Sequence, residues 1–216
     1  MDEETINILD AFAEDSVDLD ISESEIENTL DLKKFKKIIQ LDCSYNSIKK
    51  LIGFGKKINE INCSNNQLIR IYKIPPNLIE LNCSKNNIKS LDNLTSGCLQ
   101  ILNCSHNEIK TLDNLPSTLT KLDCSWNQIK YLDNLPNSLI HLECYSNYLV
   151  SLDNLPNSLI FLNCSLNRLS TLDNLPKCID RLICSHNEIK KINNLPNNLV
   201  QIEFINEQVL SNIILT

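Results

Sequence analysis

Glycine is scarce in this chain: Gly53, Gly55 and Gly97 are the only three among 216 residues. Glycine-rich loops that cradle phosphates need several glycines at fixed spacing, so loops of this kind are excluded. No run approaches the roughly 18 apolar residues that a membrane-spanning helix needs. The N-terminus, MDEETINILD, has no basic segment ahead of an apolar stretch, so we expect no secretory signal. The expected location is the cytoplasm, where thiols stay reduced.

Charge is unevenly distributed along the chain. Residues 1–32 hold twelve acidic side chains and no basic one, whereas the remainder holds fifteen acidic and twenty basic side chains. Blocks of like charge are commonly solvated and partly disordered. The alternative is an arm that folds back onto the body of the protein and competes with a partner. The sequence leaves both interpretations of this acidic leader open.

The body of the chain is an internal repeat of about twenty residues. Each unit has an apolar anchor, a Cys two residues later, an Asn five residues later, and Ile or Leu seven residues later. Successive anchors are 20 or 21 residues apart: Leu41, Ile61, Leu81, Leu102, Leu122, Leu142, Leu162 and Leu182. An apolar-x-Cys pattern is typical of a short strand with one buried face. Because a coil of twenty residues must return one strand spacing along, about 4.8 Å, we expect the strands to stack in parallel.

The consensus L-x-x-L-x-C-x-x-N-x-I, as in LIELNCSKNNI, resembles the leucine-rich repeat, with Cys in place of the third leucine. The resemblance covers residues 38–201, which is eight units. The other half of the unit, L-D-N-L-P-x-S-L, is similar to the short repeats of bacterial secreted effectors. The combination in an Asn-rich chain also resembles leucine-rich repeat proteins of giant amoebal DNA viruses, which are mimivirus-like.

The resemblance implies a single right-handed α/β solenoid, with a parallel sheet on the concave face and extended or 3-10 segments on the convex face. Proline after Leu, as at Pro116, independently favours extended return segments because proline cannot donate to a ladder. We expect three parts: an acidic leader and N-terminal cap over 1–37, eight repeats over 38–201, and a degenerate repeat with a C-terminal cap over 202–216.

Eight of the ten cysteines occupy one position of the repeat, and metal binding, disulfides, catalysis and packing are the roles to decide between: Cys43, Cys63, Cys83, Cys104, Cys124, Cys144, Cys164 and Cys184. No C-x-x-C pair is present, and one straight column of thiols does not form a tetrahedral zinc site. Neighbours in register in a parallel sheet have poor geometry for a disulfide. The pattern therefore predicts small buried core residues. Cys98 and Cys178 lie outside this column, four units apart, and are not expected to pair.

The asparagine of each unit is predicted to be structural. Its amide can donate to and accept from backbone groups of neighbouring coils, so stacked copies would form a ladder. The two ends of the stack need covering. Ser22 with Glu25 matches a capping box, and Ile26, Leu30 and Phe35 are expected to close the first coil. At the other end, residues 202–209 are expected to form an atypical ninth unit.

Candidate catalytic residues are few. His106 and His186 both lie in C-S-H-N-E-I-K, and His141 precedes Leu142. A Ser-His-Asp arrangement at Ser105 and His106 fails, because adjacent strand residues diverge and no buried carboxylate orients the imidazole. The aspartates of L-D-N-L-P are typical of solvated turns. We therefore expect no enzyme activity, no cofactor and no metal site.

Two outward columns of the repeat vary in a way that the fold does not require: the residue before the anchor and the residue two after Cys. Large apolar, aromatic and basic side chains gather there in units four to eight, and such clusters mark interaction sites. Together with two neighbouring outward residues, they are the candidate partner-binding residues: Ile101, His106, Trp126, His141, Tyr145, Phe161, Leu166, Arg181, Ile183 and His186.

The sequence thus predicts a non-catalytic protein–protein interaction module that binds a host or viral protein through its concave face. We expect no small-molecule substrate, no membrane contact and no nucleic acid, because the one basic column is incomplete and lacks stacking aromatics. An adaptor for ubiquitin-type machinery is one alternative, since bacterial effectors with similar repeats carry a ligase domain after them. Because only fifteen residues follow unit eight in this sequence, we expect no such domain and a role only as an adaptor. A structural component of a virus particle is the other alternative, with the virion as its location.

Overall fold

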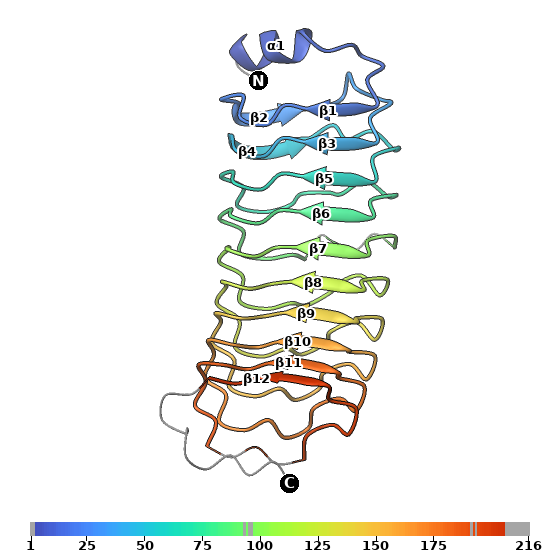
Figure 1. The fold of residues 1–216 in the computed structure, drawn as a ribbon. Helices are drawn as coiled ribbons and strands as arrows, with labels where there is room; N and C mark the ends of the chain where they lie inside the picture. The colour runs from blue at the N-terminus through green and yellow to red at the C-terminus, as the bar shows by residue number, and fades with distance from the viewer. Residues whose placement is uncertain (1–2, 93, 95–96, 191, 193, 206–216) are drawn as a thin grey trace.

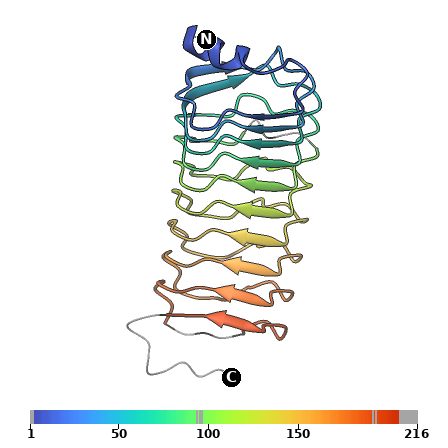
Figure 2. The same cartoon turned by 45° about the horizontal axis from the view of Figure 1, so that its top comes forward.

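The computed structural model describes residues 3–92, 94, 97–190, 192 and 194–205, which form an elongated stack of coils (Figure 1). Successive coils follow one another from one end of the stack to the other (Figure 2). The elements are α1 (Glu3–Asp10), β1 (Asp18–Asp20), β2 (Glu27–Asp31), β3 (Gln40–Asp42), β4 (Ser47–Ile52), β5 (Glu60–Asn62), β6 (Glu80–Asn82), β7 (Ile101–Asn103), β8 (Lys121–Asp123), β9 (His141–Glu143), β10 (Phe161–Asn163), β11 (Arg181–Ile183) and β12 (Gln201–Glu203). Each coil is named below by its strand in the large sheet.

Ten of these strands form one parallel sheet in the order β1-β3-β5-β6-β7-β8-β9-β10-β11-β12. The pairing is in register at the anchors, so that Leu122 lies beside Leu142, and Leu142 beside Leu162. A second, two-stranded parallel sheet joins β2 to β4 in the first coils. The predicted parallel solenoid is therefore confirmed.

The interior of the stack is filled by the anchors, the column cysteines and the flanking Ile and Leu residues. All eight column cysteines are fully buried and none forms a disulfide, whereas Cys98 and Cys178 are exposed. Five of the buried thiols donate a weak hydrogen bond to the backbone of the next coil, as from Cys104 Sγ to the Asp123 carbonyl at 3.4 Å. The packing role predicted for this column is confirmed.

The asparagine ladder is present in the predicted form. Asn127 Nδ2 donates to the carbonyls of Cys104, Cys124 and Ser125 at 3.0–3.1 Å, and its Oδ1 accepts from the N–H of Ile109 at 2.9 Å. The side chain thus satisfies backbone groups of its own coil and of the preceding coil. The same contacts recur at Asn66, Asn86, Asn107, Asn147, Asn167 and Asn187.

The N-terminal segment forms an additional coil that the sequence reasoning missed. Leu19 of β1 pairs with Leu41 of β3, and Leu19 and Ile26 are almost fully buried. The capping box predicted at Ser22 and Glu25 is wrong, because Glu25 has a φ of 57° and strand β2 follows in place of a helix. Ile26, Leu30 and Phe35, which were expected to close the first coil, are completely buried.

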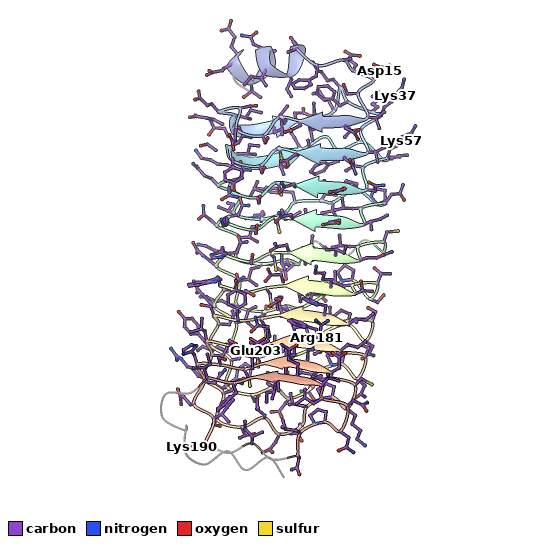
Figure 3. All side chains as sticks on the ribbon, viewed as in Figure 1. Asp15, Lys37, Lys57, Arg181, Lys190 and Glu203 are labelled. Atoms are coloured by element: carbon purple, nitrogen blue, oxygen red, sulfur yellow. The ribbon has the colours of Figure 1, made fainter. Side chains whose placement is uncertain are left out.

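The acidic leader is ordered where the structure describes it. Leu9 of α1 is 1% exposed, which is incompatible with a solvated segment. Lys34 Nζ lies 2.7 Å from an Asp10 carboxylate oxygen, and Lys37 Nζ lies 3.7 Å from that of Asp15 (Figure 3). The leader therefore covers the first end of the stack, far from β7–β11 (Figure 1).

The return side of each regular coil consists of two short turns. The first turn places Asn at a positive φ of 52–67°, at Asn114, Asn134, Asn154, Asn174 and Asn194. Asn tolerates this left-handed conformation better than most residues. The described residues of the return side contain these turns and no 3-10 segment.

At the C-terminal end, β12 continues the sheet, as expected for an atypical ninth unit. Residues 206–216 of the predicted C-terminal cap lie outside the described part of the chain. Within that part, no helix is long and apolar enough to cross a membrane.

Candidate interaction surface

The outward side of the ten-stranded sheet is called the strand face below. It carries two columns of side chains, one before and one after the buried anchors. The first column precedes the anchor and runs Ile101, Lys121, His141, Phe161, Arg181 over β7–β11. The second column follows the anchor and runs Asn103, Asp123, Glu143, Asn163, Ile183. Strand pairing in register brings equivalent side chains about 4.8 Å apart, close enough for neighbouring rings to stack.

The first column contains a stack of three planar side chains. The rings of His141 and Phe161 lie 4.2 Å apart between centroids and are tilted by only 4°. The guanidinium carbon of Arg181 lies 5.6 Å from the centre of the Phe161 ring, within cation–π range. The three side chains hold one another in place and present a flat aromatic and cationic surface.

A second aromatic cluster lies just past the C-terminal ends of the strands. The rings of His106 and Trp126 stack at 5.1 Å between centroids with an angle of 11°. Tyr145 meets Trp126 edge-on at 6.4 Å and 83°. Trp126 nevertheless remains 47% exposed. The ring contacts therefore orient the tryptophan without covering it.

Trp126 and its equivalents lie in a turn with left-handed backbone, which the sequence reasoning had placed as ordinary outward strand positions. The φ values of this column are 52–55°. Left-handed backbone costs most residues about 1–2 kcal/mol. In the return-side turns of the regular units, the left-handed position is always Asn, which adopts this conformation at lower cost. In the strand-face column the residues at the left-handed position are Tyr45, Asn65, Lys85, His106, Trp126, Ser146, Leu166 and His186.

A shallow groove of about 660 Å³ lies on the strand face between the two aromatic clusters. His141 of the first cluster and Tyr145 of the second both line it. Its remaining lining comes from both strand columns and adjoining anchors: Glu80, Asn82, Ile101, Leu102, Asn103, Lys121, Asp123, Glu143 and Asn163. The groove thus joins the two clusters into one candidate surface over β6–β10.

His141 and Glu143 meet in this groove, with Nε2 and Oε1 3.4 Å apart. Burial lowers the pKa of His141, and the neighbouring charges of Lys121 and Arg181 lower it further. Burial raises the pKa of Glu143, while a hydrogen bond from Asn163 opposes that shift. A lowered pKa keeps His141 uncharged at neutral pH, so its ring adds to the flat apolar surface. Within the described residues, Glu143 Oε2 is buried with no hydrogen-bond partner.

The predicted binding residues divide into three groups. Six form the two clusters: His106, Trp126 and Tyr145, and His141, Phe161 and Arg181. Ile101 lines the groove between them. Leu166, Ile183 and His186 continue the columns toward the C-terminal end without a ring contact to either cluster in the described part of the chain.

The sequence reasoning missed the polar groove residues Lys121, Asp123 and Glu143. Asp123 and Glu143 occupy the position after the anchor, which is Asn, Asp or Glu in most units and therefore gives little sign of function. The available signal was the one unit in which acidic Glu143 stands between His141 and Tyr145. No group of three or more His, Cys, Asp or Glu side chains within the described residues could hold a metal ion.

Comparison with known proteins places the fold. No protein-family model matches the chain, and no curated protein sequence gives a significant match. YopM from Yersinia enterocolitica is similar, with 29% identity, a TM-score of 0.63, and coverage of 87% of this chain and 51% of that one. Internalin C2 from Listeria monocytogenes has a TM-score of 0.69 at 19% identity, and the match covers 88% of this chain and 80% of the internalin chain.

The functional domain of InlJ from Listeria monocytogenes, described as including a cysteine ladder, has 24% identity and a TM-score of 0.58, with coverage of 87% and 53%. Leucine-rich repeat domains are named among the similar structures. The fold is therefore that of a leucine-rich repeat solenoid. The chain spans about half the length of YopM and of the InlJ domain.

Proposed function

We propose that this protein is a non-catalytic protein–protein interaction module that binds its partner through the strand face over β6–β11. The observation that carries the proposal is the position of Trp126. This residue is the only tryptophan of the chain, it is half exposed, and it occupies a left-handed turn that Asn or Gly would fill at lower cost.

Strained residues that the fold does not need point to function. The chain itself provides the comparison, because the left-handed turn on the return side is Asn in all five regular units. At the strand-face turn, Trp126 and Leu166 take that conformation although they remain 47% and 46% exposed. Packing inside the fold does not account for these side chains, and contact with a partner does.

The chemistry of the surface fits a protein partner. Tryptophan, tyrosine and arginine dominate the energetics of protein interfaces, and Trp126, Tyr145 and Arg181 supply one of each. The rings are oriented by their own stacking, so few rotamers are lost on binding. The groove between the clusters adds Lys121, Asp123 and Glu143 as polar groups that set the register of the partner. Solenoid folds commonly bind along such extended surfaces.

The test compares two matched sets of aromatic substitutions. Trp126→Ala and Phe161→Ala remove one ring from each cluster, whereas Tyr131→Ala removes an exposed ring away from the strand face. Partners are captured from lysate with the wild-type protein, identified by mass spectrometry, and titrated with each variant by isothermal titration calorimetry, because Trp126→Ala lacks the only tryptophan of the chain. We expect each strand-face change to weaken binding by about 2 kcal/mol or more.

The control Tyr131→Ala should bind like the wild type. Loss of binding in the control with unchanged binding in both strand-face variants would refute the proposed surface. An adaptor for ubiquitin-type machinery and a component of a virus particle would both use a surface of this kind, so the identity of the captured protein distinguishes these two roles.

A further inference from the structure

The repeat departs from its consensus on the return side of the β3 and β5 coils. Regular units carry Asp-Asn there, as at Asp133 and Asn134, with Asn in the left-handed turn. The β3 coil has Ile52-Gly53 and the β5 coil has Tyr72-Lys73 at the equivalent positions. Two consecutive coils thus exchange a polar turn for apolar and basic residues.

The backbone of the two coils differs accordingly. Gly53 keeps a positive φ of 78° and lies so close to the preceding coil that an added Cβ would fall 2.2 Å from an Asp31 carboxylate oxygen. The Ile52 carbonyl accepts from the N–H of Leu32 in that same coil at 3.0 Å. Residues 71–75 of the next coil omit the first turn altogether. The β3 coil is therefore held against its predecessor, while the coil that follows takes a different course.

A pocket of about 660 Å³ opens between these two coils. Most of its wall is apolar: Leu51, Ile52, Phe54, Ile74, Pro75 and Pro76. A smaller void of about 10 Å³ lies behind it and reaches the core at Ile61, Cys63 and Leu81. The 660 Å³ volume of the main pocket falls within the range of small-molecule sites, about 300–1,000 Å³. An apolar wall with a few polar groups is also typical of such sites.

The polar groups at this pocket are all cationic or neutral. Lys56 and Lys73 line it, and the centre of the Tyr72 ring is 5.1 Å from Lys50 Nζ and 5.3 Å from the guanidinium carbon of Arg70. No acidic side chain is among the residues that line either the pocket or the void behind it. An occupant with an anionic head and an apolar tail complements both features.

We infer that this pocket binds a fatty carboxylate of medium chain length, with the tail against Leu51, Phe54 and Ile74 and the carboxylate beside Lys56 and Lys73. A cationic head placed beside Lys56 and Lys73 would meet like charge, which disfavours binding there. The inference departs from the expectation of no small-molecule ligand, and it is independent of the strand face, which lies on another side of the coils.

The three glycines make the test direct, because their amide signals occupy a sparse region of a ¹H–¹⁵N correlation spectrum. Gly53 lines the pocket and Gly55 is two residues away, whereas Gly97 lies in the following β6 coil, is not among the lining residues, and has open space around it. Dodecanoate is added below its micelle concentration, alongside dodecylammonium with the same tail and the opposite charge. We expect saturable shifts at Gly53 and Gly55 with dodecanoate, and unchanged Gly97.

The specificity variant restores the regular repeat by Tyr72→Asp with Lys73→Asn. Its matched control makes the same two replacements in a regular coil, by Tyr131→Asp with Lys130→Asn. The specificity variant should bind dodecanoate about tenfold more weakly, equivalent to about 1.4 kcal/mol, and the control should bind like the wild type. If the specificity variant loses the native Gly97 and Trp126 signals, Lys56→Gln with Lys73→Gln removes the charge without reshaping the turn and should give the same loss.

No shift at Gly53 with dodecanoate, equal binding of dodecylammonium, or equal weakening in both double variants would overturn the inference. Each of these outcomes leaves the proposed partner surface intact, because that surface is tested with different residues and a different ligand.

Discussion

Replacing Asn127 with Ala should destabilise the protein by removing a link between two coils. The asparagine accepts a hydrogen bond from the N–H of Ile109 and donates to three carbonyls, of Cys104, Cys124 and Ser125. Asn127 is 7% exposed and Ile109 is fully buried, so water cannot replace these bonds. Replacement by alanine removes the side-chain amide and leaves the backbone of the turn unchanged.

The expected magnitude follows from the groups left behind. A buried donor or acceptor that loses its partner costs about 1–3 kcal/mol, and the Ile109 N–H is the donor most directly affected. We therefore expect Asn127→Ala to lower the free energy of unfolding by about 1–3 kcal/mol. Asn127→Asp should lose more at neutral pH, because a carboxylate would face three carbonyl oxygens without a proton to share.

Urea denaturation followed by circular dichroism measures these changes, with the slope of the transition compared among variants. Asn137→Ala, at an exposed position of an outer turn, is the control and should change the unfolding free energy by less than about 0.5 kcal/mol. Equal losses at the two sites, or an Asn127→Ala protein as stable as the wild type, would show that the ladder does not hold the coils together.

Three further outcomes are expected. In native protein, iodoacetamide should rapidly modify the two exposed thiols, Cys98 and Cys178, and leave the other eight unmodified; rapid modification of the column would contradict its burial. Burial raises the pKa of the column thiols, to about 12 for Cys83, so the unfolded chain releases these protons first as the pH rises above about 9. Stability should then fall with increasing pH by up to about 1.4 kcal/mol per pH unit for each buried thiol, and Cys83→Ala should reduce that slope in urea titrations from pH 8 to 11. Leu166→Asn should raise the melting temperature by relieving up to about 1 kcal/mol of left-handed strain, and an unchanged or lower value would mean that the turn is not strained.

Much of the fold could be predicted because its positions are repeated. An asparagine and a cysteine that recur every twenty residues predict a stack of equivalent coils, and Asn127 and Cys124 lie at the predicted positions in it. The coil of β1 was missed because Ile21 stands where the other coils have Cys, and Ser24 where they have Asn. Its signal was nevertheless present: Leu19 and Ile26 have the same seven-residue separation as Leu41 and Ile48.

The candidate site was less predictable, because its geometry depends on backbone conformation. Left-handed turns are usually identified by Gly or Asn, and Trp126 or Leu166 in such a turn gives no signal of that kind. The ring pairs could be anticipated from strand register once the anchors were aligned, as for His141 and Phe161. The pocket beside Tyr72 could not, because its volume depends on the course of the backbone where the repeat is broken.

The direction of the asparagine contacts bears on how the chain is made. Each asparagine reaches back to the coil synthesised before it, at Cys104 and Ile109 in the case of Asn127. A ribosome that adds about 5–20 residues per second releases a new coil every few seconds. Each emerging coil can therefore dock onto a finished neighbour, and the α1 end, which is covered from the outset, serves as the first template for assembly during translation.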